Sequence, residues 1–215
     1  MLDGSRCRSK RSRIKIKRSA RASHAKRPEL QGVVVHATMK LRPGLPSLRT
    51  PRAYRRIERA IRQANDRHHT RIVEYSVMSN HLHFILEPGS KRDLSRAMQG
   101  LGIRLAKALN AAWHRHGKVL IERYFARALT KVTQVRRLFR YVLNNARKHG
   151  VPIPAGQVDP YSSARWFAGW AEDVKRPNRS SPVAMPQWYE TTHWRIGGPL
   201  SVNEMPGPVH FFPAR

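Results

Sequence analysis

The sequence predicts an α+β fold in which two helices cover one face of an antiparallel sheet. Two observations support this. The hydrophobic pattern alternates between strand-like and helix-like periods in the order strand, helix, strand, strand, helix, strand, and one more helix follows. In addition, Ser79-Asn80 separates two strand-like runs and suits a tight hairpin turn. This order matches the ferredoxin-like split βαβ arrangement, with the last helix left over.

The first half of the chain supplies a strand, a helix and a hairpin. A β-branched, apolar run predicts a strand over 32–41. Apolar residues at intervals of three and four predict a helix over 51–69. Two antiparallel strands are expected over 72–78 and 81–87. On the earlier of these two strands, alternation places three residues on one face: Val73, Tyr75 and Val77.

The second half supplies a long helix, a strand and the additional helix. Leucine and methionine recur at helical spacing over 93–113. A fourth strand is expected over 119–129 and a helix over 133–149. Thr133 is expected to cap that last helix at its start, and Gly150 is expected to end it.

Alternation along the strands separates a core face from a face that carries histidines. The residues expected under the two helices are Val33, Val35, Ala37, Met39, Leu82, Phe84 and Leu86. Those expected on the opposite face are His36, Thr38, His81, His83 and Glu87. The three histidines are therefore expected to share this second face, and the additional helix is free to lie near them.

Three segments are expected. Residues 1–28 hold eleven Lys and Arg and a single acid, Asp3, and are expected to form a disordered basic tail. Residues 29–150 contain the predicted sheet and helices. Residues 151–215 are rich in proline and hold four of the five tryptophans, which predicts an irregular extension anchored by aromatic side chains.

The charge of the chain points to a polyanionic partner. Its 215 residues include 42 Lys and Arg against 13 Asp and Glu, a formal net charge of +29. Such an excess destabilises a compact state by self-repulsion, and nucleic acid is the leading candidate to neutralise it. Cys7 is the only cysteine, which excludes intramolecular disulfides and cysteine-built zinc sites. No apolar run is long enough for a membrane span and no signal-peptide core is present, so a cytoplasmic protein is expected.

His81 and His83 are the candidate metal ligands. They flank Leu82 on a predicted strand, so their imidazoles point to the same side. Neutral imidazoles together with an open coordination position suit a divalent metal that polarises a phosphate. Two solvent-exposed strand histidines without any metal are the alternative interpretation.

Tyr141 is the candidate nucleophile. It lies at the edge of the apolar stripe of the last predicted helix, with Asn145 one turn further on. A phenolate that attacks a phosphodiester forms a phosphotyrosine and frees a 3′-hydroxyl, which conserves the bond energy for rejoining. A boundary tyrosine that is half-packed against the sheet is the alternative. Among the other tyrosines, Tyr124 is the main rival.

Several stretches resemble a known family. The strand 80–85, Asn-His-Leu-His-Phe-Ile, is similar to the His-hydrophobic-His strand of the single-tyrosine HUH transposases, and 141–150 is similar to their nucleophile helix. Three further stretches resemble the subgroup of REP-associated tyrosine transposases. They are His36-Ala37-Thr38, residues 123–127 and the Asp-Pro-Tyr-Ser-Ser stretch at 159–163. The resemblance covers roughly residues 30–170. One departure is Ala146, where many relatives have proline.

The resemblance implies a role for each matching residue. Tyr141 would be the nucleophile, and His81, His83 and Asn145 would hold Mg²⁺ or Mn²⁺. His36 is a possible accessory group. The basic residues expected to bind DNA in these stretches are Arg123, Arg127, Arg147 and Lys148. Residues 29–150 would then be the catalytic domain, with the same ferredoxin-like sheet.

The expected function is that of a transposase that cleaves and rejoins single-stranded or hairpin DNA through a 5′-phosphotyrosine. Its partner would be hairpin or palindromic single-stranded DNA, it would act as a monomer or homodimer, and it would lie in the bacterial cytoplasm with the nucleoid. A catalytically silent DNA-binding descendant is one alternative, and an HUH replication initiator or relaxase is another. An RNA-recognition domain is disfavoured, because the outward positions of its central strands should carry aromatic residues.

Overall fold

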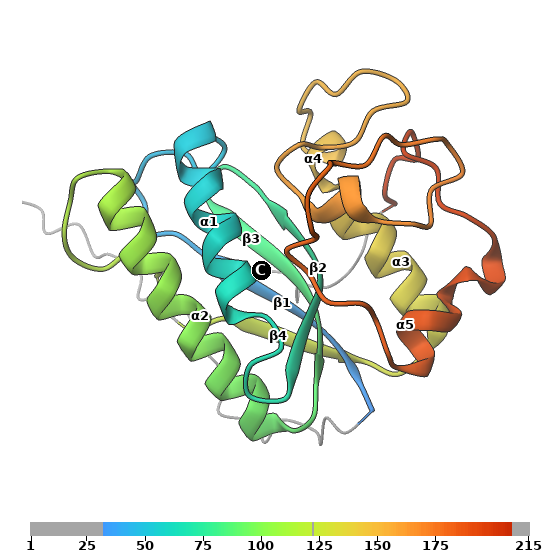
Figure 1. The fold of residues 1–215 in the computed structure, drawn as a ribbon, viewed down its shortest axis with the longest axis horizontal. Coiled ribbons are helices and arrows are strands. Elements are labelled where there is room, and N and C mark those ends of the chain that lie inside the picture. The colour runs from blue at the N-terminus through green and yellow to red at the C-terminus, as the bar shows by residue number, and fades with distance from the viewer. Residues whose placement is uncertain (1–31, 122, 208–215) are drawn as a thin grey trace, which may run out of the picture.

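The computed structural model describes residues 32–121 and 123–207 (Figure 1). The predicted basic tail therefore lies outside the described residues. The chain forms a four-stranded antiparallel sheet from β1 (Val34–Lys40), β2 (Thr70–Val77), β3 (His81–Pro88) and β4 (Phe125–Leu129), in the spatial order β2-β3-β1-β4. This order, with a helix after β1 and another after β3, confirms the ferredoxin-like prediction.

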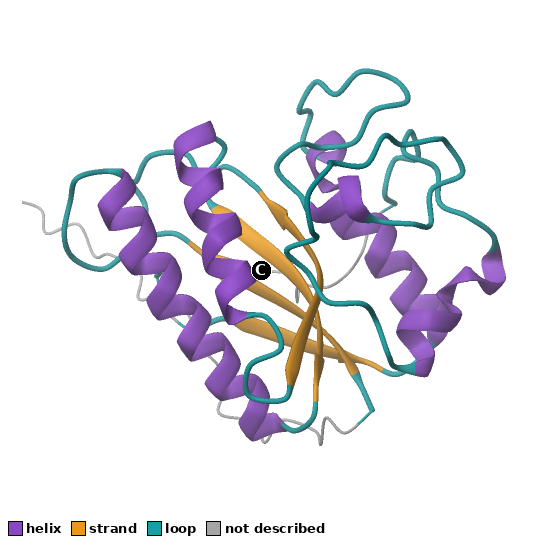
Figure 2. Cartoon of the chain, viewed as in Figure 1, coloured by secondary structure: helices purple, strands orange, loops and turns teal. Residues whose placement is uncertain are grey.

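Helices cover both faces of the sheet (Figure 2). On one face lie α1 (Pro51–Ala64) and α2 (Lys91–Ala112), and on the other lies α3 (Val132–Leu143). Thr50 starts α1, because its side chain accepts a hydrogen bond from the backbone N–H of Ala53. Ser90 starts α2 in the same way through the N–H of Asp93.

Each face of the sheet has its own apolar core. Val35, Ala37, Met39, Leu82, Phe84 and Leu86 all pack under α1 and α2, as the alternation predicts. The opposite face contributes Val34, Ile85 and Leu129, which pack against α3 and the C-terminal extension. The strands are therefore apolar on both sides, except where the histidines and a few other polar residues lie.

The first helix is shorter than its pattern predicts. It ends at Ala64 rather than at His69, because Asn65 adopts an extended backbone conformation and its side-chain oxygen accepts hydrogen bonds from the N–H groups of Asp66 and Ile72. Asp66, His68 and His69 then have positive φ angles, which a continuing right-handed helix does not allow.

A β-bulge overturns one predicted face. The register of β2 against β3 shifts between Ile72 and Glu74, so Val73 joins the core under α3 while Tyr75 and Val77 stay under α1 and α2. The same shift sends Glu74 to the α3 face. Sequence alternation alone cannot reveal the extra residue, because Ile72 and Val73 are both apolar and each suits a buried face.

Two further boundaries differ from the prediction. β4 begins only at Phe125, although Leu120 still bridges to Leu41 and Ile121 donates a backbone hydrogen bond to Lys40. The helix predicted over 133–149 is broken at Asn144, after which α4 (Asn145–Lys148) continues. Lys131, without a side-chain bond, takes the N-cap position expected for Thr133. Gly150, with φ +71°, follows α4 and turns the chain as predicted.

The extension is irregular and is anchored by aromatic side chains, as predicted. It contains short 3-10 helices at Ser163–Trp166 and Trp194–Gly197 and the helix α5 (Tyr189–His193). Trp194 is buried and stacks on Phe139 of α3 and on Phe167, with ring centroids 5.3 and 5.0 Å away. The extension thus completes the core on the α3 face.

Buried carboxylates fix the extension to the rest of the molecule. Each has a partner across the boundary between the sheet-and-helix part and the extension, so the two parts are held by charge-assisted bonds as well as by apolar contact. The pairs are Arg49 with Asp159, Glu58 with Arg179, Glu74 with Ser163, and Glu87 with the backbone N–H groups of Gln187 and Trp188.

The extension also covers the outer edge of β2. Val77 donates its backbone N–H to Tyr161, Tyr75 donates to the Ser163 hydroxyl, and Ile72 accepts from Ala184. These bonds use the outward-facing backbone groups that an edge strand otherwise leaves unpaired. On the described part of the chain, β4 is the sheet edge that no further strand covers.

Candidate active site

His81 and His83 lie side by side on the α3 face of β3, as predicted. Their ring centroids are 4.8 Å apart, with His83 buried and His81 partly exposed. The Nδ1 of His81 lies 2.8 Å from the side-chain oxygen of Asn80. Because that oxygen only accepts, Nδ1 carries the proton and the lone pair is on Nε2.

His36 completes a row of three histidines. It lies opposite Ile85 on the neighbouring strand β1, and its Nε2 is 3.0 Å from the Nδ1 of His83. Thr38 Oγ1 contacts the same Nδ1 at 3.1 Å. His36 therefore hydrogen-bonds across the sheet to a predicted metal ligand and fixes the orientation of that ligand's ring.

Tyr141 reaches this row from the last full turn of α3. Its ring meets those of His83 and His36 edge-on, with centroids 5.4 and 6.0 Å away. The side chain is buried, and burial raises the pKa of its phenol. The ammonium group of Lys148 lies 4.8 Å from the centre of the same ring. A cation at that position favours the phenolate, which burial alone disfavours.

The break in the helix positions Asn145. Asn144 caps α3 and donates two side-chain hydrogen bonds to the carbonyls of Ser201 and Glu204 in the extension. Asn145 begins α4 immediately afterwards and is fully buried. Among the described residues, neither its amide oxygen nor its amide nitrogen has a hydrogen-bond partner. A buried amide in this condition costs about 1–3 kcal/mol, so the fold retains it at some expense in stability.

Unsatisfied polar atoms gather on this face of the sheet. Besides the amide of Asn145, the Nε2 of His83 and the hydroxyl of Ser76 are buried without a hydrogen-bond partner in the part of the chain that the structure describes. Ser76 lies directly opposite His83 in the β2–β3 pairing, so the two side chains are on the same face. Such atoms in a folded protein indicate a missing ion, water or ligand.

These residues fit a divalent metal. His81 and His83 each have Nδ1 engaged by a neighbour and Nε2 available, and Asn145 has a free amide oxygen. Among the residues that the structure describes, no cluster of three or more His, Cys, Asp and Glu could hold a metal ion. The predicted ligand set has only two such residues plus an amide, and this composition leaves coordination positions open.

The imidazoles of the row are neutral near pH 7. Burial lowers the pKa of His81 to about 4, with smaller contributions from His149 and Lys40. Burial together with the charge of Arg127 lowers the pKa of His36 to about 3, and burial holds that of His83 well below its usual value. Neutral imidazole is the form that binds metal, so no proton has to leave before a metal binds.

The four predicted DNA-binding cations lie in different surroundings. Lys148 is beside Tyr141, and Arg127 is exposed on β4 opposite His36. Arg147 donates hydrogen bonds to the carbonyls of residues 153, 154 and 157, so it holds the loop that follows α4. Arg123 lies beside a cavity on the other face of the sheet.

A family model described as "Transposase IS200 like" matches residues 45–145. The matched residues include His81, His83, Tyr141 and Asn145. Among solved structures, the chain is similar to a REP-associated tyrosine transposase that was solved bound to a REP hairpin. The identity is 20%, the TM-score is 0.56, and the match covers 77% of this chain and all of that one. This likeness shows a shared fold. A search of curated proteins found no match.

The two candidate tyrosines lie on opposite faces of the sheet. Tyr141 lies among the histidines, whereas Tyr124 packs toward the core under α1 and α2, on the opposite face of the sheet. The separation of Tyr124 from β3 along the sequence did not indicate the face of the sheet on which Tyr124 lies. The alternation along β4, where Ala126 and Ala128 share the face of Tyr124, does so once the strand is known.

Sequence reasoning missed two residues that lie near the site, Ser76 and His149. Ser76 was not singled out because a serine at the end of a strand carries little signal. His149 follows α4, and its ring centroid is 6.0 Å from that of His81. The position of His149 next to the row of histidines depends on the helix break at Asn144. The hydrophobic pattern does not show this break.

Proposed function

We propose that the protein is a DNA strand transferase that cleaves and rejoins single-stranded or hairpin DNA through a 5′-phosphotyrosine on Tyr141. One observation carries the proposal. A buried tyrosine meets the row of histidines at the place where His83 and Asn145 keep polar atoms without partners. The match of residues 45–145 to the IS200-like transposase model supports the proposal, because transposases break and rejoin DNA.

A divalent metal would be held by Nε2 of His81, Nε2 of His83 and the amide oxygen of Asn145. Mg²⁺ or Mn²⁺ bound there supplies a Lewis acid that polarises an oxygen of the scissile phosphate. His36 and Thr38 keep the ring of His83 in place through its Nδ1, and Asn80 does the same for His81.

Tyr141 supplies the attacking oxygen. A bond forms between its Oη and the phosphorus, and the bond from phosphorus to the 3′-oxygen breaks. The phenol proton passes to solvent and the 3′-oxygen takes one up, so no other reactant is consumed. Lys148 counteracts the effect of burial on the phenol by stabilising the phenolate. The liberated 3′-hydroxyl can later attack the phosphotyrosine and restore the DNA strand.

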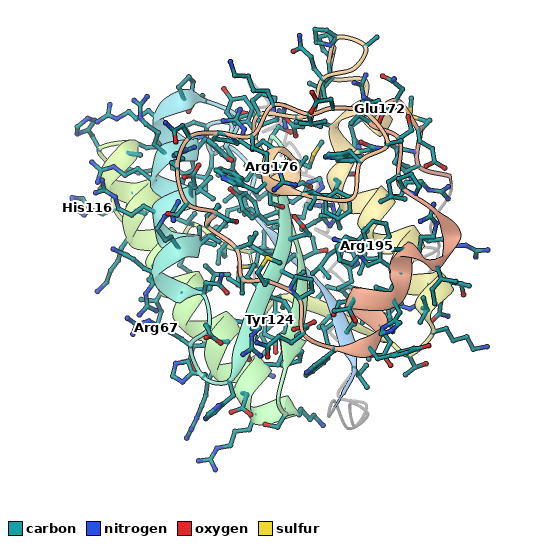
Figure 3. All side chains as sticks on the ribbon, turned by 45° about the vertical axis from the view of Figure 1, so that its right-hand side comes forward. Arg67, His116, Tyr124, Glu172, Arg176 and Arg195 are labelled. Atoms are coloured by element: carbon teal, nitrogen blue, oxygen red, sulfur yellow. The ribbon has the colours of Figure 1, made fainter. Side chains whose placement is uncertain are left out.

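Single-stranded or hairpin DNA is the proposed partner. The formal charge of +29 favours a polyanion, and the similar solved transposase was bound to a REP hairpin. Side chains that end in nitrogen atoms project from the outside of α1 and α2 and from the extension (Figure 3). Near the histidines, Lys148 and Arg127 are the cations placed to meet the phosphates that flank the cut.

The test is a covalent adduct. Purified protein is mixed with labelled DNA hairpins drawn from the sequence flanking its own coding region, with Mn²⁺ or with a chelator, and resolved on a denaturing protein gel. We expect a protein-linked label only with metal. Tyr141→Phe should abolish the adduct and keep DNA binding. Tyr189→Phe, which removes the hydroxyl of an exposed tyrosine of α5, is the matched control and should react like the wild type.

Other outcomes would decide against the proposal. An adduct that persists in Tyr141→Phe would show that another residue is the nucleophile, and Tyr124→Phe would be the next variant to examine. Tight hairpin binding with no adduct under any metal would identify a binding-only descendant of a transposase. An adduct that forms equally well in the presence of a chelator would remove the role given to His81, His83 and Asn145.

A further inference from the structure

A second site lies on the opposite face of the sheet from Tyr141. There, a cavity of about 500 Å³ opens between α2 and the chain that leads into β4. Met39, Met98 and Gly102 contribute apolar lining, and Tyr124 contributes an aromatic ring. A cavity of this volume is within the range of small-ligand sites. The cavity lies apart from Tyr141, whose ring is on the opposite face of the sheet.

The polar groups of this cavity favour an anionic ligand. Its lining includes two exposed cations, Lys118 and Arg123, and no acidic side chain among the described lining residues. Ser95 and Gln99 add a hydroxyl and an amide from successive turns of α2. Apolar walls, an aromatic ring, cations and a few hydrogen-bonding groups together match a nucleotide, whose base is flat and aromatic and whose phosphate is charged.

β4 connects this cavity to the catalytic face. Phe125 lies opposite Thr38 and Arg127 opposite His36, so both are on the face of the histidines, and Phe125 is 37% exposed. Arg123 and Tyr124 immediately precede them and line the cavity. From Arg123 to Arg127 the chain advances roughly 13 Å, about the length of two nucleotides. A single strand of DNA can therefore pass around this sheet edge, which no strand of the described residues covers.

We propose that the cavity is a base-binding subsite for single-stranded DNA, which takes one nucleobase of the strand that flanks the cut. The base inserts against Tyr124, and Arg123 and Lys118 neutralise the neighbouring phosphates. The subsite rests on the proposed function, because the strand must extend from the phosphate that Tyr141 attacks. It adds a contact with bases, in contrast to the phosphate contacts that the overall charge supplies.

Gly102 offers a way to fill the cavity without removing any group. A Cβ built there would lie 3.4 Å from Cδ1 of Leu120 and 3.7 Å from Cε of Met39, which are ordinary contacts. Gly102→Leu therefore places a side chain in the cavity, and it also replaces a glycine inside a helix with a better helix former. Gly102→Ala keeps most of the volume and is the matched control. Tyr124→Leu removes the aromatic ring and retains apolar bulk.

The experiment compares DNA with and without bases. Fluorescein-labelled (dT)20, (dA)20 and an abasic 20-mer carry the same phosphates, and their affinities are measured by fluorescence anisotropy. Loss of one base-stacking contact weakens binding roughly 5- to 150-fold. We expect Gly102→Leu and Tyr124→Leu to lose that much affinity for (dT)20 or (dA)20 and to bind the abasic strand within about twofold of the wild type. Gly102→Ala should follow the wild type on all three.

The cations are tested by salt dependence. Each phosphate contact on a single strand contributes about 0.7 to the slope of log affinity against log salt. Arg123→Ala should reduce that slope by about this amount for all three strands, because it removes a phosphate contact rather than a base contact. Gly102→Leu should leave the slope unchanged.

Three results would overturn the subsite. These are wild-type affinity of both cavity variants for (dT)20 and (dA)20, an equal loss on base-bearing and abasic strands, and a wild-type protein that does not distinguish them. Each leaves the adduct assay on the wild-type protein unaffected, so a failure of the subsite is distinguishable from a failure of the function proposed for Tyr141.

Discussion

Glu74 is expected to make this protein less stable as the pH rises. Its carboxyl group is buried on the α3 face and contacts the hydroxyl of Ser163, which also accepts a hydrogen bond from the backbone N–H of Tyr75. The same hydroxyl lies 3.0 Å from the carbonyl of Tyr75. One hydroxyl hydrogen cannot serve both the carbonyl and a carboxylate, so the arrangement is satisfied when Glu74 itself carries a proton.

The magnitude follows from the pKa. Burial raises the pKa of Glu74 from 4.5 to about 8, and the hydrogen bond of Ser163 lowers it by less. Between these two values the unfolded chain is ionised while the folded protein holds the proton, so the free energy of unfolding decreases as the pH rises. The stabilisation is complete below the unfolded pKa and is lost through the folded one. From about pH 6 to about pH 8 the expected decrease is roughly 2 kcal/mol.

The assay is urea unfolding of the wild type and of Glu74→Gln across this pH range. Glutamine has the same shape and is always neutral, so its stability should stay nearly constant where that of the wild type falls. Asp173→Asn, which removes an exposed carboxylate, is the control and should parallel the wild type. If the curves of the wild type and Glu74→Gln run parallel from about pH 6 to about pH 9, Glu74 is ionised in the folded protein and the reasoning is wrong.

Two other substitutions test the site and the extension. Asn145→Leu should raise the free energy of unfolding by about 1–2 kcal/mol, because it removes a buried amide without partners, and should abolish Mn²⁺ binding in calorimetry. A destabilised variant that still binds Mn²⁺ would contradict both parts. Arg49→Ala should cost about 3–5 kcal/mol in urea unfolding, because it leaves the buried carboxylate of Asp159 unpaired. Arg56→Ala, on the exposed face of α1, should change little; similar losses for both would show that the Arg49–Asp159 pair does not hold the extension.

Much of the sheet could be predicted because its elements are separated by clear local signals. The hairpin turn at Ser79-Asn80 and the alternation around His83 place the two predicted metal-binding histidines on one face without any knowledge of distant residues. The apolar stripe of the last helix likewise places Tyr141 at its edge. These features depend on residues only a few positions apart, which the hydrophobic period records directly.

What the sequence did not reveal depends on contacts between distant residues. The bulge at Val73 and the helix break at Asn144 both involve the extension, since Ser163 bonds to β2 and Asn144 bonds to Ser201 and Glu204. The position of Tyr124 required the pairing of β4 with β1. None of these contacts is marked by a residue pattern near the place where it acts.

The covered edge of β2 limits how the sheet can associate. The extension uses the backbone groups of that edge, so among the described strands only β4 is available for pairing with another chain. Two copies that joined through β4 would form a continuous sheet with a covered strand at each end, and a third copy would find no edge to extend it. Strand addition through the described sheet therefore stops at two molecules and does not propagate into a fibre. A DNA strand that occupies the β4 edge would prevent even that pairing.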